Sequence, residues 1–196
     1  MKKNKKALAL ALGASVGLAV TTPSYANLVV NGGFETGDFT GWTEDPANTG
    51  NFVGGDPHSG SFSAFDGSIR GLDVISQSVA TLGGAGYNLS FWMKSADGEI
   101  PGGTEFLVKW DANVILDLKP VPNQGYTEYN FFVTAQPGGG DTLTFGLRNE
   151  GYYTQLDDVS LSPSIPGVPE AGATMGYVTL GLLALWGMKK NLGPLD

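Results

Sequence analysis

The sequence NLSFWM, at residues 88–93, decides the fold class, because its apolar residues Leu89, Phe91 and Met93 recur at every second position. A spacing of two is the period of a β-strand with one buried face. The same spacing recurs at Phe62 and Ala64, at Phe106, Val108 and Trp110, at Tyr129, Phe131 and Val133, and at Leu143, Phe145 and Leu147. No window has the 3.6-residue period of an amphipathic helix, so this region is predicted to be all-β.

Turn-forming residues separate the predicted strands. Clusters rich in glycine and proline lie at residues 54–57, 83–86, 101–103, 122–125 and 137–140. Such clusters mark turns and loops, and parallel strands would need crossover helices that this pattern lacks. We therefore expect one antiparallel β-sandwich of about eight or nine strands within residues 27–162.

Residues 1–26 have the pattern of a secretory signal peptide. Four lysines precede an uncharged apolar run at residues 7–20, and Ser24 and Ala26 supply the small residues of a cleavage site. The alternative is a membrane anchor, but a helix of this run would span only about 21 Å of the roughly 30 Å of hydrocarbon. We expect signal peptidase to cleave before Asn27.

The C-terminal region predicts a membrane segment. A proline-containing linker at residues 163–170 is followed by an uncharged apolar run from Ala171 to Met188 and by Lys189-Lys190, with a short tail at residues 191–196. The run is long enough for a transmembrane helix, and the two lysines favour a cytoplasmic C-terminus. The alternative, a helix docked on the sandwich, is less favoured because the segment is apolar all round. We assign residues 171–190 to the helix and its basic flank.

Charge limits the classes of molecule that the domain can bind, and cysteine content limits how the domain is stabilised. Residues 27–165 contain five basic and 17 acidic side chains, a net charge of −12, and the chain has no cysteine. An acidic surface repels phosphate, so nucleic acid and anionic membrane surfaces are poor partners, whereas cations are favoured. An exported domain without disulfides must depend on its core or on a bound metal.

Two resemblances refine this interpretation. The order Val168-Pro169-Glu170, apolar helix and Lys189-Lys190 resembles the PEP-CTERM class of bacterial sorting signals over about 30 residues. This resemblance implies processing by an exosortase and delivery to the cell surface or extracellular matrix. The motifs NGGFETG at residues 31–37, HSG at 58–60, LSFW at 89–92 and LDDVSL at 156–161 resemble the galactose-binding-like jelly roll of many carbohydrate-binding modules.

The second resemblance implies a structural calcium ion. Its ligands would be Glu35, backbone groups near Ser59 and Gly60, and Asp157. Alternation along residues 156–161 places Asp157 with Val159 and Leu161 on the core side, where an unpaired carboxylate is costly, and Asp158 on the solvent side. Hydrogen bonds to Asp157 are the alternative to Ca²⁺, which takes hard oxygen ligands of this kind.

Sugar sites need aromatic faces with polar groups around them. The candidate ligand-binding residues are Trp92, Tyr126, Asn149, Tyr152 and Tyr153, and the last two occupy a loop, where binding residues concentrate. Packing in the core or under a loop is the alternative for each aromatic, and we expect Trp42 and Trp110 to be core residues. Trp92 should lie on the opposite face from Phe91 and Met93, exposed or covered by a loop.

An enzyme is disfavoured, and no catalytic residue is assigned. His58 is the single histidine, and there is no cysteine nucleophile or G-x-S-x-G turn. We expect an exported, C-terminally sorted envelope or matrix protein that binds polysaccharide or forms part of the matrix. Two alternatives remain open: a surface hydrolase acting on glycans, and a purely structural surface protein.

Overall fold

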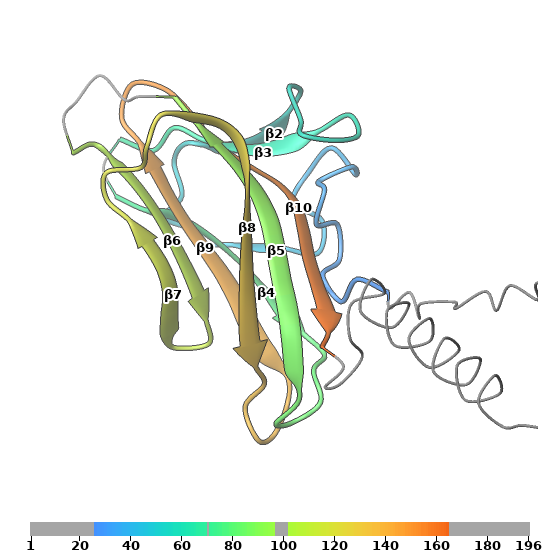
Figure 1. The fold of residues 1–196 in the computed structure, drawn as a ribbon. Coiled ribbons are helices and arrows are strands. Elements are labelled where there is room, and N and C mark those ends of the chain that lie inside the picture. Colours follow the sequence, from blue (N-terminus) through green and yellow to red (C-terminus); the bar gives the residue numbers. More distant parts are fainter. Residues whose placement is uncertain (1–25, 70, 97–101, 165–196) are drawn as a thin grey trace, which may run out of the picture.

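The computed structural model describes residues 26–69, 71–96 and 102–164. The regular secondary structure in these ranges consists of β-strands (Figure 1). Nearly all of the predicted signal peptide, the Val168-Pro169-Glu170 motif and the predicted membrane helix lie outside the described residues. Within the described ranges no helix is long and apolar enough to cross a membrane.

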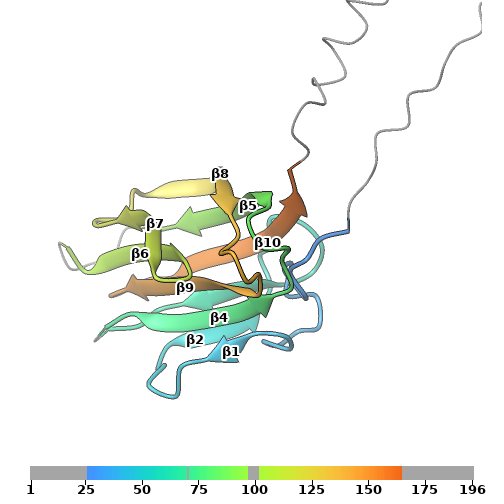
Figure 2. The same cartoon turned by 90° about the horizontal axis from the view of Figure 1, so that it is seen from below.

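Ten strands form two five-stranded sheets that pack face to face, and Figure 2 shows them from below. Every strand pair is antiparallel. Sheet A has the order β1 (Thr43–Glu44), β4 (Asp73–Val79), β9 (Asp141–Asn149), β6 (Thr104–Trp110) and β7 (Asn113–Leu118). Sheet B has the order β2 (Asn51–Gly54), β3 (Ser63–Asp66), β10 (Thr154–Pro163), β5 (Gly86–Ser95) and β8 (Gln124–Thr134).

The predicted antiparallel sandwich is confirmed, with ten strands in place of eight or nine. Two of the shortest strands lie at the N-terminal end of the domain. β1 has two residues and β2 has four, so neither is long enough to show an alternation that the sequence alone could reveal.

The alternating apolar residues fill the space between the sheets. Leu89, Phe91 and Met93 of β5 have no exposed surface, and the ring of Phe91 lies 5.2 Å from that of Phe145 in β9, in an edge-to-face contact. This contact joins the two sheets, and edge-to-face pairs are a favoured arrangement of buried rings. Trp42 and Trp110 are buried as expected.

β10 breaks the alternation, and this break positions the candidate site. Leu156 lies opposite Met93 and Leu161 lies opposite Leu89, both in the core, although their numbers differ by five. A β-bulge between Asp157 and Ser160 inserts the extra residue, and Asp158 there has a left-handed φ of 48°. The prediction that Asp157 points into the core is therefore wrong, because the bulge leaves it beside Trp92 on the outer face of sheet B.

Candidate functional site

The loop between β2 and β3, residues 55–62, folds over the outer face of sheet B. Its His58 ring stacks on the Trp92 indole with a centroid distance of 3.6 Å and an interplanar angle of 11°. Tyr126 meets His58 in an edge contact at 5.5 Å. Trp92 is thus on the outer face, as predicted, and it is covered by a loop.

Two neighbouring carboxylates of the β10 bulge hold this loop. Asp157 has no exposed surface, and its Oδ2 accepts hydrogen bonds from the backbone N–H of His58 at 2.8 Å and of Ser59 at 3.2 Å. Asp158 accepts from Ser59 Oγ at 2.8 Å and pairs with His58 Nδ1 at 2.7 Å. The carboxylate of Asp157 is therefore buried by the loop that it anchors.

Glu35 holds the other end of the loop. Its Oε1 accepts hydrogen bonds from the backbone N–H of Ser61 at 2.8 Å and of Phe62 at 3.0 Å. Gly60 has a left-handed φ of 70°, and a Cβ there would lie 2.3 Å from Glu35 Oε1. Only glycine allows this carboxylate to approach the turn so closely.

The four residues that the resemblance assigns to calcium are thus brought together: Glu35 contacts Gly60, and Asp157 contacts Ser59. The position that a Cβ would take at Gly33 lies 3.5 Å from Asp158 Oδ1, 3.7 Å from Glu35 Cγ and 3.8 Å from Asp157 Oδ1. Gly33 therefore lies within ordinary contact distance of all three acidic side chains, although Glu35 turns its carboxylate toward Ser61 and Phe62.

The residues present supply only part of what a hard cation requires. Burial raises the pKa of Asp157 to about 6, against the hydrogen bonds from backbone N–H groups, which lower it. None of the ion pairs in the described residues includes Glu35 or Asp157. No group of three or more acidic, histidine or cysteine side chains there is arranged to hold a metal by itself, so a calcium ion would also need backbone carbonyls and water.

Tyr126 belongs to the same packed cluster as Trp92. Its hydroxyl lies 2.9 Å from the carbonyl oxygen of Asp56 and 2.9 Å from Gln155 Oε1, and burial raises its pKa to about 12. Lys94 forms an ion pair with Asp56 and places its Nζ 5.6 Å from the centre of the Tyr126 ring. These contacts tie the loop to β5, β8 and β10.

Asn149 is not at the surface with the two loop tyrosines. Its side chain has no exposed area, and its Nδ2 donates to the carbonyl oxygen of Ala96 at 2.9 Å. It also lies 3.3 Å from the hydroxyls of Ser95 and Thr154. Asn149 therefore ties β9 to β5 and β10 inside the sandwich.

Tyr152 and Tyr153 are 50% and 47% exposed, and the structure joins Tyr153 to two aromatics that the sequence did not single out. Phe52, which is 41% exposed, stacks on Phe65 at 4.9 Å, and Tyr153 meets the edges of both rings at 5.3 and 5.9 Å. We call Phe52, Phe65, Tyr152 and Tyr153 the aromatic patch. Phe52 and Phe65 lie in four-residue strands, where their shared outward direction depends on cross-strand pairing.

No protein-family model and no curated protein matches the chain. Solved structures do resemble it. The carbohydrate-binding module TmCBM61, in complex with β-1,4-galactotriose, has a TM-score of 0.55 and 19% identity over 71% of this chain and 99% of the module. The CBM22-1 xylan-binding domain of Paenibacillus barcinonensis Xyn10C has a TM-score of 0.51 and 15% identity over 75% of this chain and 100% of that domain.

The enzymatically active domain of bacteriophage CBA120 tailspike protein 4 has a TM-score of 0.55 and 17% identity, over 70% of this chain. The chain covers only 21% of that protein. Identities this low show the fold alone. The described residues therefore form a jelly-roll β-sandwich of the kind found in carbohydrate-binding modules.

Proposed function

We propose that this protein binds an extracellular polysaccharide through the aromatic patch. The observation that supports it is the contact between two partly exposed rings, Phe52 and Tyr153, beside the exposed Tyr152 in the sequence, on a fold shared with glycan-binding modules. Exposed aromatic groups of this kind mark interaction sites, and rings present flat apolar faces to the C–H groups of a sugar. The tyrosine hydroxyls add polar contacts at the edge.

In this proposal Trp92 and Tyr126 hold the β2–β3 loop in place and do not contact the sugar. Trp92 is covered by His58, and the Tyr126 hydroxyl is already hydrogen-bonded to the loop and to Gln155. A sugar could stack on Trp92 only after the loop had moved. The two residues instead fix the β2–β3 loop beside the strands that carry Phe52 and Phe65.

A calcium ion at Glu35, Asp157 and the backbone near Ser59 and Gly60 is part of the proposal. When bound, the ion would neutralise the negative charge of these carboxylates and would have a structural role only. The residues themselves hold the β2–β3 loop against the β10 bulge, since each carboxylate accepts hydrogen bonds from the loop backbone.

The proposed setting is the cell envelope or its surrounding matrix. It depends on the signal peptide at residues 1–26, the Val168-Pro169-Glu170 sorting motif and the helix at residues 171–190. Mass spectrometry of the protein from its native host tests both proposed cleavages, by signal peptidase at the N-terminus and at the sorting motif near the C-terminus. A chain that begins at Asn27 and ends near Glu170 is the expected result, and a chain intact from Met1 to Asp196 would exclude this processing.

Affinity electrophoresis of the full chain tests glycan binding, with β-1,4-galactan and xylan as probes. Tyr153→Ala and Phe52→Ala should each lower the affinity for the polysaccharide about tenfold, which corresponds to about 1.4 kcal/mol of binding free energy. Phe132→Ala is the matched control, because Phe132 is a 65% exposed phenylalanine on β8. Retardation that survives both patch variants, or that Phe132→Ala lowers equally, would rule out the patch.

The same preparation separates binding from the two alternatives. A surface hydrolase would release reducing sugar from these polysaccharides at a sustained rate, which we do not expect. A purely structural protein would bind neither polysaccharide in any variant. Either result would replace the proposed function.

A further inference from the structure

The β2–β3 loop contains an Asp-Pro peptide bond in an unusual backbone conformation. Asp56 has a left-handed φ of 64°, and Pro57 follows it directly. A residue before proline normally has an extended backbone, because the proline ring clashes with it in other conformations, so a left-handed φ at this position is strained. Among the described non-glycine residues with a positive φ, only Asp56 precedes a proline. Strain of this kind persists where surrounding contacts hold it, and it is concentrated at functional sites.

Contacts with two other strands hold the Asp56 side chain. Its Oδ2 forms an ion pair with Lys94 of β5 and accepts a hydrogen bond from Gln155 Nε2 of β10 at 3.4 Å. The hydrogen bond from Lys94 lowers the pKa of Asp56, so the side chain is present as the nucleophilic carboxylate. The side chain is nevertheless 64% exposed, so water reaches it.

The carbonyl oxygen of the same peptide bond lies beside a hydrogen-bond donor. The Tyr126 hydroxyl is 2.9 Å from the main-chain oxygen of Asp56 and 2.9 Å from Gln155 Oε1, and its single proton can go to either oxygen. Burial raises the pKa of Tyr126 to about 12, so the hydroxyl keeps this proton. A donor in this position stabilises the negative charge that develops on a carbonyl oxygen when its carbon is attacked.

We propose that the chain cleaves its own Asp56-Pro57 peptide bond. The Asp56 Oδ1 attacks the main-chain carbonyl carbon of the same residue, and the Tyr126 hydroxyl donates to the oxyanion that forms. The bond from this carbon to the Pro57 nitrogen then breaks, and the nitrogen takes a proton from water and leaves as a secondary amine. Asp56 is left as a cyclic anhydride, which water opens to a free C-terminus. The net reaction is therefore hydrolysis of one peptide bond, with water as the only other reactant.

A second Asp-Pro bond of the chain provides an internal comparison. Asp45 precedes Pro46 without a left-handed φ, and its Oδ1 accepts a hydrogen bond from the Ala47 N–H at 2.8 Å. Its carbonyl oxygen also has a donor, the Asn48 N–H at 2.9 Å. The two bonds thus differ in backbone strain and in how the carboxylate is held. Strain in the intact bond lowers the barrier to its cleavage, so Asp56-Pro57 should be cleaved about tenfold or more faster.

The cut leaves the domain assembled. Strands β2 and β3 stay paired on either side of the loop, from Asn51 to Gly54 in β2. Asp157 and Glu35 still hold the part of the loop that follows the cut, through the backbone N–H groups of His58 and Ser61. The two fragments therefore separate only after denaturation.

Incubation of the purified full chain in neutral buffer for several days tests the proposal, with denaturing electrophoresis and mass spectrometry as readouts. We expect one fragment that ends at Asp56 and one that begins at Pro57. Added hydroxylamine should trap the anhydride as a hydroxamate on Asp56, a product that a contaminating protease does not form. Asp56→Glu keeps the negative charge but requires a larger ring, so it should abolish cleavage. Tyr126→Phe removes the donor and should slow cleavage about a hundredfold.

Asp45→Ala is the matched control, because it removes the carboxylate of the other Asp-Pro bond and should leave the rate at Asp56-Pro57 unchanged. Near-UV circular dichroism checks that each variant is folded. A wild-type chain that stays intact at Asp56-Pro57, or a wild-type rate in Asp56→Glu or Tyr126→Phe, would overturn the proposal. Equal rates at the two Asp-Pro bonds would also overturn it, because they would indicate hydrolysis that does not depend on this loop.

Discussion

Gly32→Ala tests the contact that fixes the β10 bulge. Gly32 lies against the bulge, where its carbonyl oxygen accepts a hydrogen bond from the Val159 N–H at 2.9 Å. A Cβ at Gly32 would lie 2.0 Å from the Val159 carbonyl oxygen and 3.0 Å from its carbonyl carbon. Both atoms belong to the backbone of a buried strand, so one chain segment has to move away from the other.

The expected loss of unfolding free energy combines two effects. Overpacking of a close contact costs about 1–3 kcal/mol, and a broken backbone hydrogen bond adds about 1 kcal/mol. We therefore expect Gly32→Ala to destabilise the protein by about 2–4 kcal/mol. Urea unfolding of the full chain, followed by tryptophan fluorescence in EDTA, measures this difference.

Gly125→Ala is the matched control. Gly125 lies in β8, is exposed, and has no atom within 4 Å of the position that a Cβ would take. Alanine lowers the conformational entropy of the unfolded chain, so this substitution should raise the free energy of unfolding by about 0.4–1 kcal/mol. A Gly32→Ala variant within about 0.5 kcal/mol of the wild type would show that the N-terminal turn does not approach the bulge in this way.

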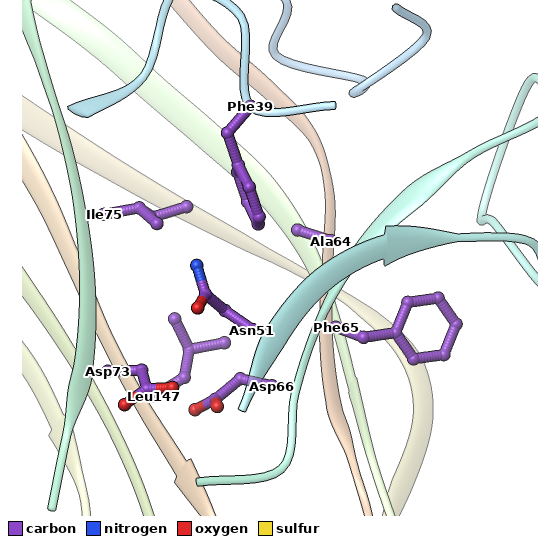
Figure 3. A pocket seen from close by; sticks show the side chains of 8 residues that line it. All are labelled: Phe39, Asn51, Ala64, Phe65, Asp66, Asp73, Ile75 and Leu147. Carbon is purple, nitrogen blue, oxygen red and sulfur yellow. The ribbon is translucent and has the colours of Figure 1, made fainter. Parts of the chain in front are cut away.

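Three further predictions concern the core, the proposed calcium site and the buried carboxyl group of Asp66, which faces Asp73 in a small pocket between the sheets (Figure 3). Phe145→Ala removes the ring that joins the sheets and should cost about 3–5 kcal/mol in urea unfolding; a loss below about 1 kcal/mol would contradict the central place of this ring. Calcium at about a hundred times its dissociation constant should stabilise the protein by about 2.7 kcal/mol through the proposed site at Glu35 and Asp157, and Asp157→Asn should remove that gain; a melting temperature that EDTA does not change argues against this site. In EDTA, wild-type stability should fall between pH 5 and 7 by about 1.4 kcal/mol per unit more than that of Asp66→Asn. The sign follows because Asp66, with a pKa of about 8, keeps its proton when folded and loses it on unfolding; parallel pH profiles would show that Asp66 does not hold that proton.

Local pattern was sufficient for the buried faces of the longer strands. The buried faces of β5, β6 and β9 follow directly from alternation, since neighbouring side chains of a strand point to opposite sides whatever the strand pairs with. The same rule placed Trp92 on the outer face and Trp110 in the core. The net charge of the domain, and with it the preference for cations, also needs only the sequence.

The candidate sites depended on contacts between distant parts of the chain. Alternation alone directed Asp157 to the core, and only the bulge that β10 forms while pairing with β5 turns it outward. The surroundings of Asn149 likewise come from the ends of two other strands, β5 and β10, which bury a side chain that the sequence offered as a ligand-binding residue.

The sequence by itself determined that this domain is an acidic antiparallel sandwich, because side-chain alternation and charge are properties of each segment alone. Only the tertiary structure decided that Phe52 joins Tyr153 and that Asp66 meets Asp73. Phe52 lies in β2 and Tyr153 in the loop before β10, while Asp66 and Asp73 belong to opposite sheets, so only the packing of these segments against one another brings the partners together.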